Sequence, residues 1–467
     1  MRRPNILVLY TDQQRWDALG SAGNPDILTP NLDRLAASSA RFSHHFVQAP
    51  VCMPSRASFL SGQYPANLGI THMGVPLPES VPLISHYLRP YGYRTANIGK
   101  LHALPHANRD HRNPHPSYGF DHLEISDEPG PYEDAYRAWV RAKDPEAMDG
   151  ISAGLPPTAE VWLNTMGLDD TVHHPPDRLP LHAVPFPAAD DLTHTAFVSE
   201  QTQAFIAGQA ANPWLCIAGF YSPHSPWIVP QKYLDLYDPA ALTLPDEAVL
   251  ESADPRGKLG NTTRESDLRS IVHGYYAMIS EVDDHVGRIL DQLETSGVSD
   301  STMIVFTSDH GEWLGQFGRF GKGYPADDAV SRVPLMIHLP GASTGRDVDT
   351  IVEAVDVLPT ILDVAGVQTP PVMQGTSLLP LILGQTQARP DVAITEHHGW
   401  KSMRTQDHRY LVESDGSEHL FALDTDPHCL HDLVNNEDRQ IDIAKFRHTL
   451  LHRLITRERP IDRTWTY

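Results

Sequence analysis

The sequence predicts an α/β fold: a mostly parallel sheet sandwiched by helices, followed by a smaller C-terminal α+β subdomain. Short continuous apolar runs recur along the 467-residue chain, and such runs are typical of central strands that are buried on both faces. Stretches with helical spacing alternate with these runs, which is the pattern of a sheet covered by helices. Polar residues follow each run directly, as expected where a ligand site forms at the carboxyl ends of parallel strands.

The N-terminal elements show this pattern. Residues 4–12 form an apolar run with β-branched members, which predicts a buried strand with Asp12 at its carboxyl end. A helix is predicted to begin near Pro30, because proline is favoured in the first helical turn. Leu32 and Leu35 follow it at helical spacing. The chain therefore opens with a strand and then a helix.

Later segments repeat this order. Three more buried strands are expected at residues 95–99, 214–220 and 302–307. The polar residues that follow these strands are Lys100, His224 and Asp309. An amphipathic helix is predicted over residues 272–293, with Gly297 as its stop. Residues 105–190 are rich in Pro, His, Asn and Asp, so we expect long surface loops that carry short elements and shape a pocket.

The C-terminal part has a different pattern. A proline-rich passage at residues 369–371 precedes shorter alternating runs, such as residues 392–395 and 408–412. Alternation is typical of strands with one exposed face. We therefore expect a large α/β domain over residues 1–370 and a subdomain with a small antiparallel sheet and a helix over residues 371–467.

Composition excludes several classes of function. The chain has 36 Lys and Arg against 59 Asp and Glu, a formal net charge of -23, which disfavours nucleic acid or an anionic membrane surface as a partner. Its early apolar runs are far shorter than the ~20 residues of a membrane-spanning helix, and no signal-peptide pattern precedes them. Three widely spaced cysteines disfavour a disulfide framework. We therefore expect a cytoplasmic protein.

The most specific motif is Val-Cys-Met-Pro-Ser-Arg-Ala-Ser-Phe-Leu-Ser-Gly-Gln-Tyr at residues 51–64. It resembles the signature of the formylglycine-dependent sulfatases, the type I sulfatases of the alkaline phosphatase superfamily, in which the cysteine is converted to formylglycine. The resemblance implies an alkaline-phosphatase-like fold, a catalytic domain over residues 1–370, and Cys52 as the modified residue. An ordinary buried thiol is the alternative for Cys52.

The chemistry of such a residue follows from its functional group. One hydroxyl of the hydrated aldehyde attacks sulfur and releases the alcohol, and the other hydroxyl then collapses to expel sulfate, which divides one difficult step into two. A thiolate has no comparable route for breakdown of its adduct. Arg56, one helical turn after Cys52, is expected to hydrogen-bond the diol and to offset the carboxylates of a metal site.

A divalent metal would polarise the sulfate and lower the pKa of the attacking hydroxyl. The sequences Thr-Asp-Gln-Gln at residues 11–14 and Thr-Ser-Asp-His-Gly-Glu at residues 307–312 resemble the two metal segments of the sulfatases. By this resemblance the ligands are Asp12, Gln13, Asp309, His310 and the modified Cys52. The family implies Ca²⁺, whereas Gln and His where many sulfatases have Asp and Asn favour a softer ion such as Mn²⁺. Gln13 could instead lie outside the ligand set.

Three further segments resemble sulfate-binding parts of the family. Gly-Lys-Leu-His at residues 99–102 implies that Lys100 holds a sulfate oxygen and the diol, and that His102 takes the proton of the diol during elimination. Pro-His-Ser-Pro at residues 223–226 places His224 at the leaving-group oxygen. Gly-Lys at residues 321–322 places Lys322 there as well. Such cationic and hydrogen-bonding groups are what an anionic substrate needs in a water-poor site.

The resemblance covers nearly the whole chain and implies hydrolysis of a sulfate ester, either an aryl sulfate or another small organosulfate. The alternative in the same superfamily is a phosphonate monoester or phosphodiester hydrolase, or a promiscuous enzyme with both activities; Lys100 and His102 favour the sulfatase. A catalytically silent binding protein is expected to lack Cys52, Lys100 or His224.

The expected partners are a formylglycine-generating maturation enzyme and a second subunit, on which the tail from Arg457 to Tyr467 could dock.

Overall fold

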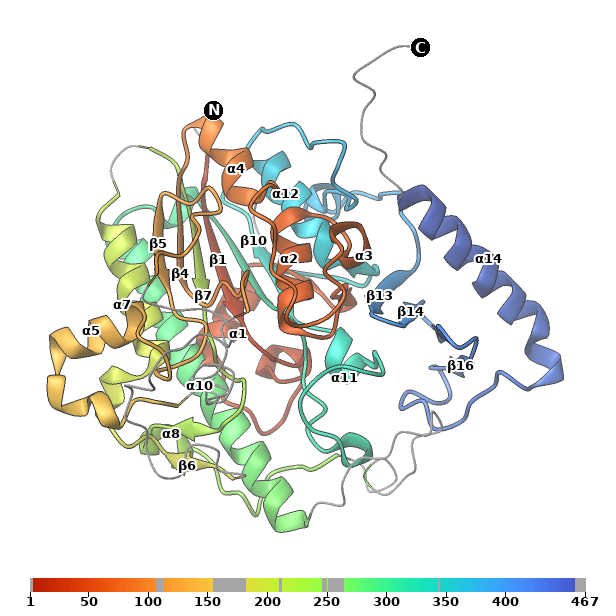
Figure 1. Cartoon of the computed structure of the whole chain (residues 1–467), viewed down its shortest axis with the longest axis horizontal. Helices are drawn as coiled ribbons and strands as arrows, with labels where there is room; N and C mark the ends of the chain where they lie inside the picture. Colours follow the sequence, from red (N-terminus) through yellow and green to blue (C-terminus); the bar gives the residue numbers. More distant parts are fainter. Residues whose placement is uncertain are drawn as a thin grey trace.

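The computed structural model describes residues 3–105, 113–153, 182–209, 212–245, 250, 264–342 and 345–457. Its centre is an eight-stranded sheet with the order β11-β2-β10-β9-β1-β7-β4-β5 (Figure 1). The bounds of these strands are Arg346–Val348 (β11), Ala40–Phe42 (β2), Leu335–His338 (β10), Thr302–Ser308 (β9), Asn5–Thr11 (β1), Trp214–Gly219 (β7), Arg94–Gly99 (β4) and His122–Ile125 (β5). The four expected strands are confirmed as the adjacent central strands β9, β1, β7 and β4.

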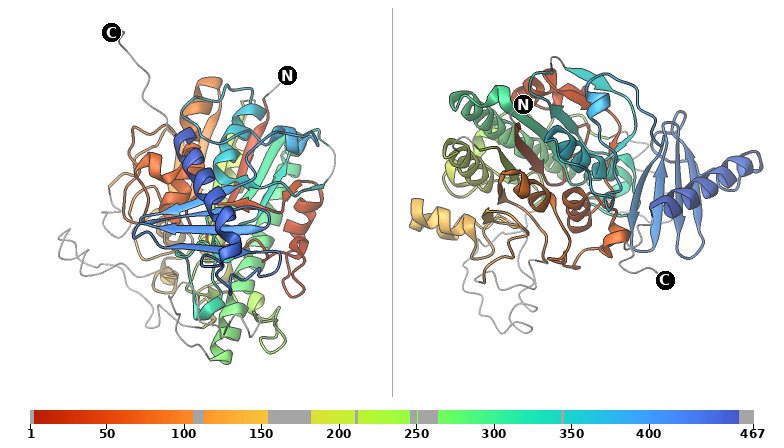
Figure 2. Two further views of the ribbon diagram at one scale, coloured as in Figure 1. Left: turned by 90° about the vertical axis from the view of Figure 1, so that its right-hand side faces the viewer. Right: turned by 90° about the horizontal axis from the view of Figure 1, so that it is seen from above.

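Both faces of the sheet are covered because successive side chains of a strand point to opposite sides. Ile6, Val8 and Tyr10 of β1 pack into one apolar cluster, while Leu7 and Leu9 pack into another. The first cluster includes α2 (Cys52–Ser61), α4 (Ile84–Leu88) and α12 (Val357–Val364). The second includes α1 (Pro30–Ala37), α7 (His194–Ala207) and α10 (Glu265–Thr295). This three-layer arrangement is seen from two further sides in Figure 2.

The strand pairing brings one set of strand ends together. β1 pairs in parallel with β9 on one side and β7 on the other, with Thr11 opposite Ser308 and Tyr10 opposite Gly219. Gly219 also lies opposite Gly99 of β4, again in parallel. The residues that follow these four strands therefore emerge at the same edge of the sheet. This edge carries the candidate site.

The remaining elements are short or peripheral. β10 pairs antiparallel with both β9 and β2, so the sheet is mostly but not wholly parallel. The predicted helix over residues 272–293 is the central part of α10, which begins earlier and has 31 residues. The other helices and strands are α3 (Pro65–Leu68), α5 (Ala135–Lys143), α8 (Gln231–Leu234), α11 (Asp328–Ser331), α13 (Leu379–Ile382), β3 (His45–Phe46), β6 (Val184–Pro185), β8 (Ile228–Val229) and β12 (Val352–Glu353).

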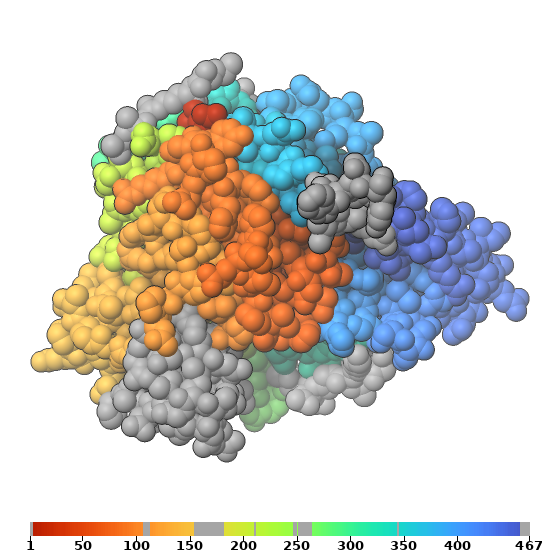
Figure 3. Space-filling view, turned by 45° about the horizontal axis from the view of Figure 1, so that its top comes forward, coloured from red at the N-terminus to blue at the C-terminus, as the bar shows by residue number. Residues whose placement is uncertain are grey.

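The C-terminal subdomain is a four-stranded antiparallel sheet with α14 (Gln440–Arg457) packed on it. Figures 1 and 3 show it on one side of the molecule, in blue. The strands are Ala393–His397 (β13), Trp400–Arg404 (β14), His408–Glu413 (β15) and Glu418–Ala422 (β16). Arg453 of α14 forms an ion pair of 2.7 Å with Glu353, which joins the subdomain to the large domain. The predicted division at residue 370 stays a prediction, and Leu378 and Ile382 still pack in the large domain's core.

No helix within the described residues is long and apolar enough to cross a membrane. The expected location in the cytoplasm stays a prediction. Of the C-terminal tail that we expect to dock on a second subunit, residues 458–467 lie outside the described residues, as do residues 106–112 and 154–181 of the expected loop region.

Candidate active site

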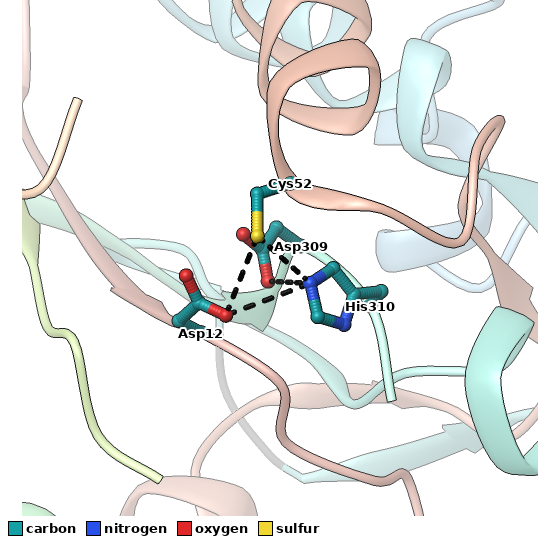
Figure 4. Close-up of side chains that lie close together, drawn as sticks. All are labelled: Asp12, Cys52, Asp309 and His310. Atoms are coloured by element: carbon teal, nitrogen blue, oxygen red, sulfur yellow. Dashed lines mark hydrogen bonds and ion pairs between the residues drawn. The ribbon is translucent and has the colours of Figure 1, made fainter. Parts of the chain in front are cut away.

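Four buried side chains meet at the carboxyl edge of the central strands. Asp12 follows β1, Asp309 and His310 follow β9, and Cys52 is the first residue of α2. One ligand-type atom from each of the four lies within 4.8 Å of the others, and Figure 4 shows all four side chains pointing toward one another. The structure therefore brings together the residues at the ends of β1 and β9 and the cysteine of the signature motif, as the sequence predicts.

His310 presents a lone pair to this cluster. Its Nδ1 lies 2.9 Å from the carbonyl oxygen of Gly311, which can only accept a hydrogen bond, so Nδ1 carries the proton. The other ring nitrogen, Nε2, lies 3.2 Å from Cys52 Sγ and 3.5 Å from the Oδ1 atom of Asp12. Burial lowers the pKa of His310, which keeps the imidazole neutral. A neutral ring whose far nitrogen donates to a carbonyl is the usual form of a histidine that binds a metal.

Two buried cations balance the two carboxylates. Arg56 donates from Nε to the Oδ2 atom of Asp309 at 2.7 Å and lies 3.6 Å from Asp12. Lys100 Nζ lies 2.8 Å from Asp12 Oδ2. Burial alone would raise the pKa of Asp12, but Lys100 and the other nearby cationic groups lower it well below its usual range. Asp12 is therefore ionised. Arg56 is not the surface cation that a lone arginine often is, because its side chain is 1 % exposed.

Cys52 lies between the carboxylate cluster and a third cation, Lys322. Lys322 Nζ is 2.7 Å from Cys52 Sγ. Burial raises the pKa of the Cys52 thiol to about 12, and the charge of Asp12 adds to this effect while Lys322 opposes it. The unmodified side chain is thus a protonated thiol at neutral pH. A thiol in this state is a poor nucleophile.

Lys322 also contacts His224. Its Nζ lies 2.8 Å from His224 Nε2, and His224 Nδ1 lies 2.6 Å from the carbonyl oxygen of Ser225. Nδ1 therefore carries the proton and Nε2 accepts from the ammonium group. Burial and the charge of Lys322 lower the pKa of His224 well below its usual range, so the ring is neutral. Lys322 joins position 52 to the imidazole.

The segment that follows β5 supports Lys100 and His102, and the sequence did not indicate it. Asp127 Oδ1 accepts hydrogen bonds from the backbone N–H groups of Leu101 at 2.9 Å and His102 at 2.7 Å. Glu128 Oε1 lies 3.8 Å from Lys100 Nζ. The pattern that indicated the other strand ends, polar residues directly after a strand, would have identified Asp127 and Glu128. They were missed because they lie in a stretch interpreted as loops. The role of the His102 ring stays a prediction.

Gln13 is held next to the cluster. Its backbone N–H donates to Asp309 Oδ1 at 3.1 Å, and its backbone carbonyl accepts from the Tyr275 hydroxyl at 2.7 Å. Its side-chain nitrogen donates to Glu312. The amide oxygen of Gln13 is buried and has no hydrogen-bond partner among the described residues. A buried oxygen without a hydrogen-bond donor beside the carboxylate cluster is suited to bind a cation.

The donor set fits one divalent ion. Two carboxylates, one imidazole nitrogen and position 52 converge from three elements, and the amide oxygen of Gln13 lies beside them. Carboxylate and amide oxygens suit Ca²⁺, and oxygen with imidazole nitrogen suits Mn²⁺. Asp12, Asp309, His310 and Gln13 are therefore the residues that could hold the ion together with position 52.

Gly219 determines where Lys100 lies, and replacing it with alanine is expected to be costly. A Cβ atom at this position would meet the carbonyl oxygen of Lys100 at 2.2 Å and its nitrogen at 2.9 Å. These are backbone atoms of a buried strand end and cannot move aside singly. We expect Gly219→Ala to lower the free energy of unfolding by about 3 kcal/mol or more, measured by urea denaturation.

Gly208 is the matched control for this prediction, because it ends α7 with φ of -79° and its Cβ would meet Ala204 O at 3.3 Å and Phe205 O at 3.6 Å, with no contact under 3 Å. Gly208→Ala should change stability by about 1 kcal/mol or less. A Gly219→Ala variant as stable as the control would show that this close approach is unimportant.

Comparison with known proteins agrees with this geometry. The family model described as Sulfatase matches residues 4–367, and the model described as N-sulphoglucosamine sulphohydrolase, C-terminal, matches residues 315–457. An arylsulfatase of Clostridium perfringens is 29% identical, with 98% of this chain and 95% of that protein covered. A multifunctional alkaline phosphatase superfamily protein of Trinickia caryophylli is 30% identical over 85% of this chain and 80% of that protein.

Among solved structures, a phosphonate monoester hydrolase of Agrobacterium radiobacter has a similar fold, with a TM-score of 0.82 and 24% identity over 98% of this chain and 96% of that chain. The match of the Sulfatase model to most of the chain, together with curated relatives along its whole length, establishes the family. The chain belongs to the sulfatases, the sulfuric ester hydrolases of the alkaline phosphatase superfamily.

Proposed function

We propose that this protein hydrolyses the ester of a small organosulfate or aryl sulfate, with position 52 in its formylglycine form. The observation that supports this most strongly is the position of Cys52 Sγ, which lies 3.2 Å from His310 Nε2 of the metal-type cluster and 2.7 Å from Lys322 Nζ. A nucleophile there would lie between the ammonium group of Lys322 and the cluster that could hold a divalent ion. Charge that develops on a sulfuryl group in transfer needs such an arrangement.

The three cations have two tasks in this proposal. Lys100 and Arg56 neutralise Asp12 and Asp309, so that the carboxylates do not repel an anionic substrate. Lys322 donates a hydrogen bond to the bridging oxygen of the ester, and its raised pKa keeps it protonated. His224, with its lone pair toward Lys322 Nζ, holds that ammonium group in place beside the leaving group.

The modified residue and the metal supply the rest of the chemistry. A formylglycine at position 52, when present, supplies a hydrated aldehyde as nucleophile, and a bound divalent ion supplies Lewis acidity toward the sulfate oxygens. We propose Ca²⁺ or Mn²⁺ as the ion and a formylglycine-generating enzyme as the partner that converts Cys52. His102 is proposed to take the proton of the diol, from the position that Asp127 fixes.

The preference for a small substrate follows from charge. The chain carries a formal net charge of -23, which slows the approach of long polyanions. A small monoanionic ester is repelled less and is held locally by the buried cations. The same surface gives no attraction to nucleic acid.

Hydrolysis of phosphonate monoesters or phosphodiesters is the second candidate function. Gln13 and His310 resemble the metal residues of those enzymes, and the fold matches that of a phosphonate monoester hydrolase. Lys100 and His102 favour the sulfatase, because Gly-Lys-Leu-His at residues 99–102 resembles the segment that is typical of sulfatases.

A panel of three esters with the same leaving group separates the two functions. The enzyme, made with a maturation enzyme and loaded with Mn²⁺ or Ca²⁺, is assayed on p-nitrophenyl sulfate, bis-p-nitrophenyl phosphate and p-nitrophenyl phenylphosphonate. Because all three release p-nitrophenolate, differences in kcat/KM report on the reacting centre. We expect the sulfate ester to be hydrolysed with the highest kcat/KM. A phosphonate or phosphodiester kcat/KM at least tenfold above that of the sulfate would establish the second candidate instead.

A further inference from the structure

Glu312 is a buried carboxylate at the end of the second metal segment, and it has no role in the proposed chemistry. It lies two residues after His310, and its side chain is fully buried. Its Oε1 atom accepts hydrogen bonds from the backbone N–H groups of Leu314, at 3.1 Å, and Gly321. Its backbone carbonyl accepts from Arg15 at 3.0 Å. Glu312 is thus held from several directions, and its second oxygen has a fixed place.

That second oxygen, Oε2, accepts from the side-chain nitrogen of Gln13. The main chain of Gln13 is also held on both sides, because its N–H donates to Asp309 and its carbonyl accepts from Tyr275. With the main chain fixed and the side chain in contact with Glu312, the amide can present either its nitrogen or its oxygen to that carboxylate. Both oxygens of Glu312 accept hydrogen bonds in the structure, and an accepting oxygen is matched by the nitrogen end of the amide.

This selection decides what Gln13 offers to the cluster. With the nitrogen on Glu312, the amide oxygen is the end left over, and it is buried with no hydrogen-bond partner among the described residues. Cations of the expected kind bind amides through oxygen and never through the NH₂ group. We propose that Glu312 is a positioning residue: it orients the Gln13 amide so that its oxygen completes the cation site formed by Asp12, Asp309 and His310. The proposal rests on the proposed function only through the presence of a divalent ion.

Substitution by glutamine tests the orientation and leaves the shape of the site unchanged. In Glu312→Gln the remaining oxygen can still accept from Leu314 and Gly321, whereas an NH₂ group replaces the oxygen that faces Gln13. The Gln13 amide must then turn its oxygen to position 312 and its nitrogen to the cluster. We expect Mn²⁺ to bind this variant about 10 to 100-fold more weakly, as is typical when the group that orients a metal ligand is lost.

The reciprocal change makes the test specific. In Gln13→Glu two carboxylates face each other, and in the double variant Gln13→Glu with Glu312→Gln the donor and acceptor are exchanged while the net charge stays that of the wild type. Glu312→Gln should therefore weaken Mn²⁺ binding when position 13 is glutamine and strengthen it when position 13 is glutamate. A merely structural role of Glu312 does not produce this change of sign.

The measurement is equilibrium dialysis of the metal-free full-length protein against Mn²⁺, with bound metal determined by elemental analysis and Cys52 left as the thiol. Glu281→Gln is the control, since Glu281 is a buried carboxylate that accepts from Thr193 on a different part of the fold, and it should bind Mn²⁺ like the wild type. Weakening by the same factor in both backgrounds, or unchanged affinity in Glu312→Gln, overturns the proposal. No ester is involved, so a failure here is distinct from a failure to hydrolyse sulfate esters.

Discussion

Replacing Cys52 with alanine is expected to lower kcat on an aryl sulfate by about 10⁴-fold or more, because alanine cannot be converted to the formylglycine that the proposed function requires. The fold should be retained. Cys52 begins α2 with its side chain among the cluster, and alanine is a good helix former that leaves only a small gap. Turnover of p-nitrophenyl sulfate by enzyme produced with a maturation enzyme is the measurement.

Cys216→Ala provides the matched control, since Cys216 is also a fully buried thiol but lies within β7, away from the cluster. It should lose about 1 kcal/mol of stability at most and keep its activity. Intact-protein mass spectrometry should further show that wild-type material has lost sulfur in a fraction of the chains and reacts with hydrazides, whereas Cys52→Ala does not. Activity of the Cys52→Ala variant near that of the wild type would eliminate position 52 as the nucleophile.

Replacing Asp309 with asparagine is expected to remove the divalent ion and with it most of the activity. Asn keeps the shape of the side chain and one oxygen, but it removes the negative charge that a divalent ion needs in this buried site. We expect metal affinity to fall by about 10²-fold or more, since a direct ligand should matter at least as much as the groups that orient it. Elemental analysis of the purified, dialysed variant measures the occupancy.

The choice of asparagine over alanine matters for stability. Asp309 pairs with Arg56 at 2.7 Å, and removing one partner of a buried ion pair typically costs about 3 to 5 kcal/mol. Asp327→Asn is the control, because Asp327 is likewise buried and pairs with Arg409 at 3.2 Å in another part of the molecule. The control should retain its metal. Full occupancy in Asp309→Asn would mean that Asp309 is not a ligand.

Sequence reasoning located the strands well because their signal is local. A continuous apolar run bounded by polar residues indicates a buried strand, and Asp12, Lys100 and Asp309 were identified as strand-end residues by that pattern alone. That these ends meet also follows from parallel pairing. The short antiparallel strand β10 gave no such signal, because its place between β9 and β2 is decided by long-range pairing.

The supporting residues were harder to predict for a similar reason. Glu312 acts on Gln13 across 299 residues of sequence, and Asp127 acts on His102 across 25. The strand-end pattern can indicate Asp127 as a site residue, but neither of these two contacts can be predicted from the residues next to either partner. The identity of the side chains at the site could be predicted from motifs, whereas their hydrogen-bonding partners required the fold.

The burial of α2 limits when its first residue can be processed. All ten of its residues, from Cys52 to Ser61, are inaccessible. Under the proposed function, an enzyme that converts Cys52 has to reach a side chain that is only 1 % exposed in the folded protein, so we expect conversion to precede folding of the large domain. Protein that folds first should then keep its cysteine. We therefore expect that adding the maturation enzyme to purified, folded protein does not increase the active fraction.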